Sequence, residues 1–198
     1  MSNFEEYMDT FIRTTHHLIY NPDYEEAYNT MLDYLKETKF YNGRLFIIGM
    51  GGSAANAQHM ANDFRKIAGI DAYSLSDNIA ELTARANDDG LDSIYINSLK
   101  VSHFGPLDIL FVLSVSGGNE EKKASMALVK AMEYACDRDG TVMAIVGMPD
   151  SEAEILADVI IVIPTPSKYV TQIAEALQPV IWHGLVSDTS IIENQAKW

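Results

Sequence analysis

The first forty residues carry apolar side chains at the spacing of two amphipathic helices. The first apolar stripe consists of Phe4, Tyr7, Met8, Phe11, Ile12, Leu18 and Ile19. Asn3 and Glu6 resemble the capping box that opens a helix, and Asn21-Pro22 ends this helix and starts the next. The second stripe consists of Tyr24, Ala27, Tyr28, Met31, Leu32 and Leu35. Both stripes are more apolar than a small domain needs outside its sheet, and this excess of apolar surface predicts a homo-oligomer.

From Arg44 onward, short apolar runs alternate with helical stretches. The predicted strands are Leu45–Gly49, Ala72–Leu75, Asp108–Ser114, Val142–Gly147 and Asp158–Ile163. The predicted helices lie at about 54–68, 77–88, 92–100, 119–138 and 168–187. This alternation is typical of βαβ units, and strands apolar on both faces indicate a buried parallel sheet. The sequence therefore predicts an α/β fold of three layers, a doubly wound, five-stranded parallel sheet with helices on both faces, plus two N-terminal helices.

The composition favours one acidic globular domain over residues 1–198, with a helical extension at 1–40 and an α/β core at 41–187. The 28 acidic residues outnumber the 14 basic ones, and the net charge of −14 repels phosphate backbones, so direct nucleic-acid binding is not expected. The single Cys136 excludes an internal disulfide framework. With no signal-like leader and no apolar run approaching the roughly 18 residues of a membrane span, we expect a cytoplasmic protein without membrane partners.

Two predicted strands end in loops that are suited to anions. Gly49-Met50-Gly51-Gly52-Ser53 follows the first strand and opens a helix, whose N-terminal N–H groups and partial positive charge favour phosphate. Ser114-Val115-Ser116-Gly117-Gly118-Asn119 follows the third strand and is expected to open a helix as well, with Glu120–Lys123 as its solvated first turn. Glycine after a strand also occurs in ordinary β-to-α turns, so each loop alone permits both interpretations. Neither loop has the spacing of a Walker or dinucleotide-binding motif.

Imidazoles and carboxylates pair on two of the predicted helices. His59 and Asp63 are four residues apart and share a helix face, and Glu175 and His183 are eight apart, close to two turns. On facing helices, these groups could perform acid–base chemistry or hold a divalent metal. From spacing alone, an ordinary i,i+4 pair and a buried core histidine explain the same residues.

Residues 49–64, which read GMGGSAANAQHMANDF, resemble the first motif of the sugar isomerase (SIS) family, and most closely that of the phosphoheptose isomerases. Those enzymes commonly read G-N-G-G-S-A followed by Q-H-F-A-x-E. Ala86-Asn87-Asp88 is similar to the family's second segment, and Ser114-Val115-Ser116-Gly117 to its S-T-S-G phosphate loop. Glu175 to His183 resembles its closing helix, Q-E-x-H-x-x-x-x-H. The resemblance spans about residues 40–187 and also suits the two N-terminal helices.

This resemblance implies a reaction and roles for individual residues. Phosphoheptose isomerases serve heptose biosynthesis by interconverting sedoheptulose 7-phosphate and glycero-manno-heptose 7-phosphate through an enediol, as homotetramers with sites between subunits. By position, Asp63 is the catalytic base and His183 the catalytic acid. The family's zinc ligands fall at His59, Asp63, Glu175 and His183. Its substrate-binding positions fall at Gly51, Gly52, Ser53, Asn87, Asp88, Ser114, Val115, Ser116, Asn119 and Glu175.

The chain departs from the family's pattern at several of these positions. Met50 replaces the usual asparagine, Val115 replaces a threonine, and Asn119 stands where a further phosphate-binding serine is expected. Asp63 in place of glutamate shortens the base by one methylene, and a misplacement of about 1 Å can cost on the order of a hundredfold in rate. Glu175 in place of glutamine adds a negative charge, which helps a divalent metal and disfavours an anionic substrate when no metal is bound.

Three functions stay open on the sequence alone. They are a phosphosugar aldose–ketose isomerase, a non-catalytic SIS oligomer that binds a phosphosugar or a protein such as the bacterial replication initiator, and a lyase or etherase of the same family. Ionisable side chains at all four acid–base and metal positions favour the isomerase, whereas the altered phosphate loop favours the non-catalytic protein.

Overall fold

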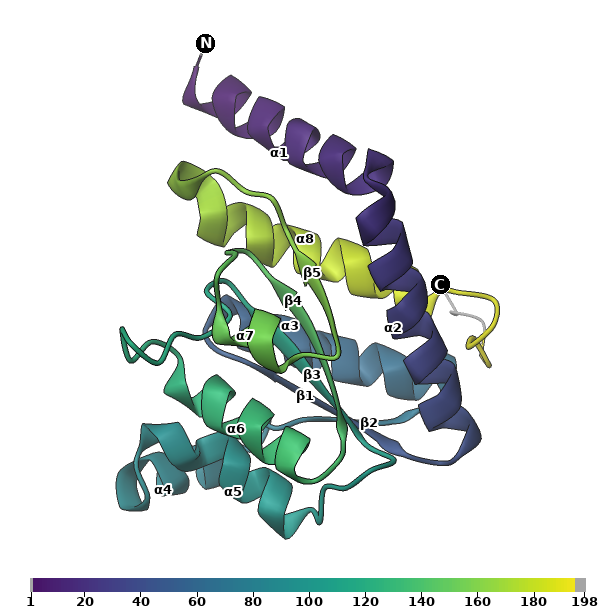
Figure 1. Ribbon diagram of the computed structural model, residues 1–198, viewed down its shortest axis with the longest axis vertical. Helices are drawn as coiled ribbons and strands as arrows, with labels where there is room; N and C mark the ends of the chain where they lie inside the picture. Colours follow the sequence, from purple (N-terminus) through teal and green to yellow (C-terminus); the bar gives the residue numbers. More distant parts are fainter. Residues whose placement is uncertain (1, 195–198) are drawn as a thin grey trace.

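The computed structural model describes residues 2–194, and a sheet of five parallel strands lies at their centre (Figure 1). The strands are β1 (Arg44–Gly49), β2 (Asp71–Ser74), β3 (Ile109–Ser114), β4 (Thr141–Val146) and β5 (Val159–Val162). Their order across the sheet is β2-β1-β3-β4-β5. The predicted doubly wound parallel sheet is therefore confirmed, with strand bounds that differ from the predicted ones by no more than a residue or two.

Eight α-helices accompany this sheet within residues 2–194. They are α1 (Asn3–Tyr20), α2 (Pro22–Phe40), α3 (Gly52–Asp63), α4 (Ile79–Asp88), α5 (Ile94–Val101), α6 (Met126–Asp137), α7 (Glu152–Leu156) and α8 (Val170–Val186). A π-helical turn over Phe64–Ala68 prolongs α3, and 3-10 turns over Leu91–Ser93 and Ser167–Tyr169 precede α5 and α8. In this part of the chain, every helix falls short of the length and apolar character that crossing a membrane requires.

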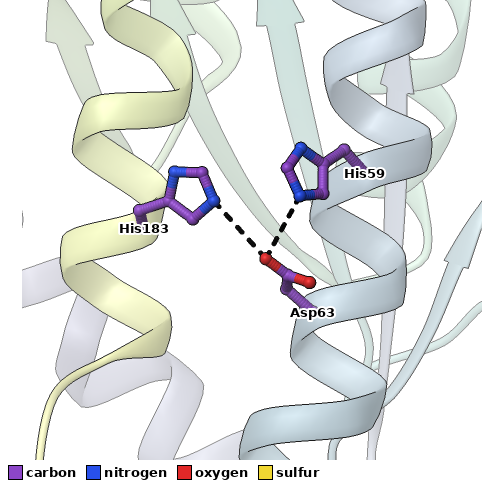
Figure 2. Close-up of side chains that lie close together, drawn as sticks. All are labelled: His59, Asp63 and His183. Carbon is purple, nitrogen blue, oxygen red and sulfur yellow. Dashed lines mark ion pairs between the residues drawn. The ribbon is translucent and has the colours of Figure 1, made fainter. Parts of the chain in front are cut away.

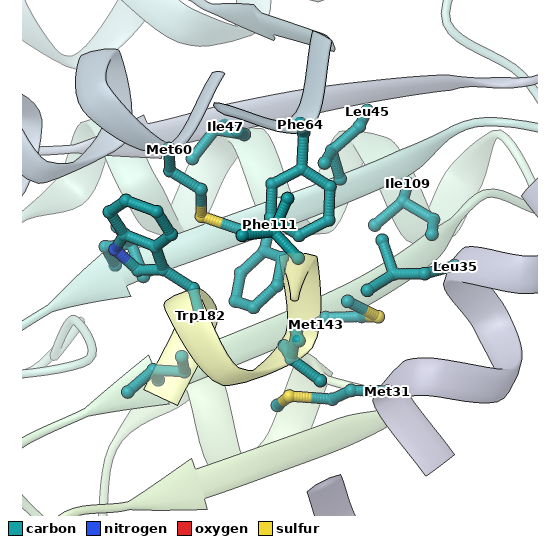
Figure 3. Close-up of a cluster of buried hydrophobic side chains, with 14 of the residues drawn as sticks. Met31, Leu35, Leu45, Ile47, Met60, Phe64, Ile109, Phe111, Met143 and Trp182 are labelled. Carbon is teal, nitrogen blue, oxygen red and sulfur yellow. The ribbon is translucent and has the colours of Figure 1, made fainter. Parts of the chain in front are cut away.

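The helices form two layers because successive side chains of a strand point to opposite faces of the sheet. In β1, Leu45 and Ile47 pack toward α2, α3 and α8, while Phe46 and Ile48 pack toward α5 and α6. Figure 3 shows the first of these cores, where Trp182 of α8 lies with side chains of α2 and α3 against the sheet. The predicted three-layer arrangement is confirmed.

The two N-terminal helices form where the apolar stripes predict them, but α1 begins one residue earlier than its predicted cap. Ser2 is the N-cap, and its hydroxyl accepts from the Glu5 N–H while the Glu5 carboxylate accepts from the Ser2 N–H, at 3.2 and 2.7 Å. The capping box is therefore Ser2–Glu5, and the predicted Asn3–Glu6 pair is wrong. Pro22 stands in the first turn of α2, as predicted.

The largest correction concerns the segment after β3. The predicted helix over 119–138 begins only at Met126, and the predicted first turn at 120–123 belongs to a chain reversal. Asn119 and Ala124 exchange backbone hydrogen bonds of 3.0 and 2.9 Å across this reversal. Ser125, with a φ of 53°, closes it and turns the chain into α6. Separately, the five-residue helix α7 went unpredicted because one turn is too short to show periodicity.

The strand order determines where a ligand can bind. The chain leaves β1 for α3 on one face of the sheet, whereas it leaves β3, the neighbour of β1, for α6 on the other face. The loops after β1 and β3 therefore diverge at the carboxyl ends of adjacent strands. In doubly wound sheets, ligands bind in the crevice that opens at such a point.

Candidate active site

Two imidazoles and one carboxylate meet between helices α3 and α8 (Figure 2). His59 and Asp63 lie one turn apart on α3, and His183 faces them from α8. The Asp63 Oδ2 atom is 3.4 Å from His59 Nε2 and also 3.4 Å from His183 Nε2. The i,i+4 pair predicted from the sequence therefore has a third member, which a distant part of the chain supplies.

The two imidazoles are open to solvent on one side and lie against a tryptophan on the other, whereas the Asp63 side chain is largely buried. The His59 and His183 side chains are 56% and 44% exposed, so the alternative of a buried core histidine is wrong. Trp182 is fully buried, and its ring centroid lies 3.8 Å from that of His183 and 5.0 Å from that of His59. The indole therefore supports both imidazoles from the core side.

This donor set fits a zinc ion. The candidate ligand atoms of His59, Asp63 and His183 all lie within 4.8 Å of one another. Bonds of about 2.1 Å in tetrahedral geometry place neighbouring ligand atoms about 3.4 Å apart, which is the separation found on both sides of Asp63. The expected approach of His59 and His183 is confirmed. A metal held here would polarise a carbonyl oxygen as a Lewis acid.

Glu175, the fourth predicted ligand, is not part of this group within residues 2–194. Its carboxylate packs against Gly52 at the start of α3, in the space that the Cβ atom of a larger residue would occupy. The predicted approach of Glu175 to His59 and Asp63 is absent, because its carboxylate lies at the beginning of α3 and the imidazoles lie near its end.

The loop after β1 opens a helix, as predicted. Gly51 is the N-cap of α3 with a φ of 61°, a conformation that glycine adopts without strain. The Ser53 hydroxyl is buried and accepts a hydrogen bond of 3.1 Å from Gln178 on α8. From the opposite layer, the Tyr95 hydroxyl of α5 donates to the Gly49 carbonyl, and burial raises the pKa of Tyr95 to about 12, which keeps this donor protonated.

The loop after β3 brings the hydroxyl of Ser116, which the sequence predicts as a site residue, together with that of Ser125, which it does not predict. The buried Ser114 hydroxyl accepts from the Gly117 N–H at 3.0 Å, within the loop itself. The half-buried Ser116 hydroxyl lies 3.3 Å from that of Ser125. The Asn119 amide oxygen instead accepts from the Lys122 N–H at 2.7 Å. The chain reversal over 119–125 thus places Ser125, and not Asn119, beside Ser116.

The remaining predicted residues lie elsewhere. Asn87 and Asp88 end α4 and are exposed, with the Asn87 amide donating to the Asp88 carboxylate at 2.7 Å. Helix α4 packs beside α5, on the face of the sheet opposite to α3 and α8. The Val115 side chain is half-buried against the core that includes α3 and α8, and its carbonyl accepts from the Gly147 N–H at 2.9 Å. A single copy of the chain does not bring Asn87 or Asp88 to His183.

Two side-chain amides that sequence reasoning missed, the buried Gln178 and the half-buried Asn56, connect these parts. Gln178 on α8 donates to both the Ser53 hydroxyl and the Ser114 carbonyl, and Asn56 on α3 donates to the Gln178 side chain. Asn56 also donates to the Glu175 carbonyl at 2.9 Å. That carbonyl lacks its usual helical donor because Pro179, four residues later, has no N–H. In the sequence, the proline inside the apolar pattern of α8 was the available sign that a helix carbonyl needs a donor from elsewhere.

The three-layer α/β fold carries two imidazoles and a carboxylate on α3 and α8, and known proteins match the chain in sequence and in fold. The model of the SIS domain family matches residues 6–147, and the chain belongs to this family. This confirms the resemblance that the motifs indicate.

Among relatives, a phosphoheptose isomerase from Chlorobaculum tepidum is 33% identical over 141 residues, which cover 68% of this chain and 64% of the relative. A phosphoheptose isomerase from Helicobacter pylori is 30% identical over 151 residues, covering 71% and 72%. The chain thus matches about two thirds of the length of these relatives. The structure of phosphoheptose isomerase GmhA from Neisseria gonorrhoeae has the same fold, with a TM-score of 0.81 at 22% identity, covering 92% of this chain and 95% of that one.

Proposed function

We propose that the protein is a phosphosugar aldose–ketose isomerase whose substrates are sedoheptulose 7-phosphate and glycero-manno-heptose 7-phosphate. The observation that carries this proposal is the Asp63 carboxylate, which lies 3.4 Å from imidazole nitrogens on α3 and α8, and α3 is the helix that the loop after β1 opens. The names of the curated relatives support the same activity. The cytoplasmic location expected from the sequence stays a prediction.

The reaction moves one hydrogen between adjacent carbons, so it needs a base at carbon and an acid at oxygen. Asp63 takes the proton from C1 of the ketose and returns it to C2 of the enediol. His183 gives a proton to the C2 oxygen and takes one from the C1 hydroxyl, so that the sugar gains and loses the same number of protons. Zinc held by His59, Asp63 and His183 would stabilise the negative charge that develops on oxygen.

The phosphate group is proposed to lie at the loops after β1 and β3. Free N–H groups at the start of α3 and the Ser116 and Ser125 hydroxyls supply local positive potential and donors. Such local dipoles allow a protein of net charge −14 to bind an anion. The Glu175 carboxylate beside Gly52 opposes an anion at α3 itself, which favours the serines as the principal contacts.

The proposal is tested by incubating the protein with sedoheptulose 7-phosphate in deuterated water and following exchange at C1 and C2 by NMR. Exchange that depends on the protein supports the isomerase. Thermal unfolding with a panel of sugar phosphates tests binding independently of catalysis, since a ligand that binds only the folded state raises Tm. The absence of both exchange and any Tm shift would favour the non-catalytic SIS protein.

Ser116→Ala is expected to weaken substrate binding more than turnover. A hydrogen bond to a charged group contributes about 1.5–3 kcal/mol, so KM should rise by roughly tenfold to a hundredfold while kcat changes little. Steady-state kinetics measure both constants. Ser187→Ala, which alters an exposed serine after α8, is the matched control and should leave KM unchanged. An unchanged KM in Ser116→Ala would contradict the assigned phosphate site.

The assembly is proposed to be a homotetramer with sites between subunits. Helix α1 packs one face on the core and leaves Phe4, Ile12 and Ile19 exposed by 72%, 61% and 65%. A groove of about 550 Å³ between α1, α2 and α8 is lined by apolar side chains, including those of Val180 and Ile181. A neighbouring copy would cover this surface, and it is also the available source of Asn87 and Asp88 for the site.

Light scattering at micromolar concentration is therefore expected to give about 88 kDa, four times the 22.0 kDa chain. Ile12→Glu should shift the protein toward smaller species, because a charge then replaces an apolar side chain on the exposed face of α1. Ile155→Glu makes the same change at an isoleucine of α7 that is 76% exposed, in the layer opposite to α1 and α2, and serves as the control. A 22.0 kDa species for the unaltered protein would refute the oligomer.

A further inference from the structure

Gln178 lies at the junction of α8 with both candidate phosphate loops. Its side chain is fully buried, although it carries a polar amide. The Nε2 group donates to the Ser53 hydroxyl at 3.1 Å and to the Ser114 carbonyl at 3.3 Å, and Oε1 accepts from the Asn56 amide at 2.9 Å. One side chain therefore bonds the first turn of α3, the last residue of β3 and a neighbouring side chain of α3.

The partners determine which way this amide points. The Ser114 carbonyl can only accept a hydrogen bond, and the Asn56 Nδ2 group can only donate one. Rotating the Gln178 amide by half a turn would place oxygen against oxygen at Ser114 and hydrogen against hydrogen at Asn56. Both amide hydrogens and the oxygen are thus used in a single arrangement. A buried network that is satisfied in this way is rigid, and losing one member leaves the others unpaired.

Gln178 adds a side-chain link between the two loops. Their strands are hydrogen-bonded neighbours, with Gly49 opposite Leu113, but the chain beyond them turns to opposite faces of the sheet. Gln178 spans the gap from α8, the helix that also carries His183. The two residues are five positions apart, about 7.5 Å along the axis, so one rigid helix supports both the loops and the imidazole.

We propose that Gln178 is a positioning residue for substrate: it holds the two phosphate loops at a constant distance from each other and from His183. This inference rests on the proposed phosphosugar isomerase function. It assigns no substrate contact to Gln178 itself, which acts through Ser53 and Ser114. Loss of the amide should therefore weaken binding of the phosphate end of the sugar, while Asp63 and His183 keep their own geometry.

The test measures sedoheptulose 7-phosphate binding by calorimetry together with kcat and KM for Gln178→Met, which keeps the length of the side chain and removes its hydrogen bonds. We expect Kd and KM to rise by about tenfold and kcat to fall by no more than about threefold. Gln172→Met makes the same replacement at an exposed position of α8 and should leave all three constants unchanged. If Gln178→Met fails to fold, Gln178→Glu keeps the acceptor for Asn56, removes both donors and is expected to raise Kd at least as much.

A double-variant cycle separates positioning from general loosening of the fold. If Gln178 acts through Ser53, Ser53→Ala combined with Gln178→Met should raise Kd no more than the larger single effect. Independent effects would multiply instead, and that result would overturn the inference. So would a Gln178→Met protein that binds sedoheptulose 7-phosphate as tightly as the unaltered protein. If the unaltered protein itself does not bind this sugar phosphate, the proposed function fails, and the inference fails with it.

Discussion

Asp63→Asn is expected to slow hydrogen exchange between sedoheptulose 7-phosphate and solvent by about a thousandfold, within the range of about 10² to 10⁴ that general acid–base catalysis contributes. An amide cannot take up a proton from carbon, whereas a carboxylate can. Asparagine keeps the size of the side chain, and its oxygen can still accept the hydrogen bond of 2.9 Å that the Asn62 amide donates to Asp63. The fold and the oligomer should therefore survive, which Tm and light scattering would verify.

Asp71→Asn is the matched control for this result. It makes the same chemical change at an exposed carboxylate in β2, which pairs with Arg65 at 2.9 Å. Surface ion pairs contribute little to stability, so exchange and Tm should stay close to those of the unaltered protein. Exchange at the normal rate in a folded Asp63→Asn protein would show that this carboxylate is not the base.

His183→Ala is expected to remove both exchange and zinc binding. The imidazole is the proposed acid, and it is also one of three ligand groups that lie within 4.8 Å of one another. Losing one of three protein ligands should lower zinc affinity by at least about a hundredfold, since even residues that only support a ligand contribute ten- to a hundredfold. A competition titration with a chromophoric chelator measures this affinity without any catalytic assay.

The control for the histidine is His16→Ala, on an exposed part of α1. This variant removes an imidazole far along the chain from α3 and α8, so zinc affinity should not change. The two readouts also separate two roles of His183. If exchange is lost but zinc affinity stays normal, His183 is the acid but not a zinc ligand. If exchange continues at the normal rate, His183 is not the acid.

The sequence predicts the layers of the fold well because burial imposes its pattern on long segments. Strands such as Leu110–Leu113 are apolar on both faces, and only the interior of a parallel sheet accommodates them. Predictions fail where backbone geometry depends on a few local contacts. The reversal that ends at Ser125 depends on the hydrogen-bonded pair Asn119–Ala124, and helical periodicity over the same residues concealed it.

The same distinction between regular patterns and local contacts applies to the candidate site. The spacing of His59 and Asp63 on one helix was readable, because helical geometry alone puts them on one face. The family resemblance supplied His183 as their partner, and the structure brings it there. The position of Glu175 depends on how closely α8 approaches Gly52, and the position of Ser125 depends on the chain reversal, so neither followed from local spacing. Gln178 was not predicted because its partners, on α3 and at the end of β3, lie far from it in the sequence.

The proline in α8 restricts the order in which this sequence can change. With Pro179 present, the Glu175 carbonyl depends on Asn56 for its donor, so losing Asn56 first would leave a carbonyl in a half-buried position unpaired. With alanine at 179, the helix would supply its own N–H, and position 56 would have to satisfy only Gln178. Replacing Pro179 before Asn56 is therefore less destabilising than replacing Asn56 before Pro179. In divergent descendants of this chain, a change at 56 should follow a change at 179 and seldom precede it.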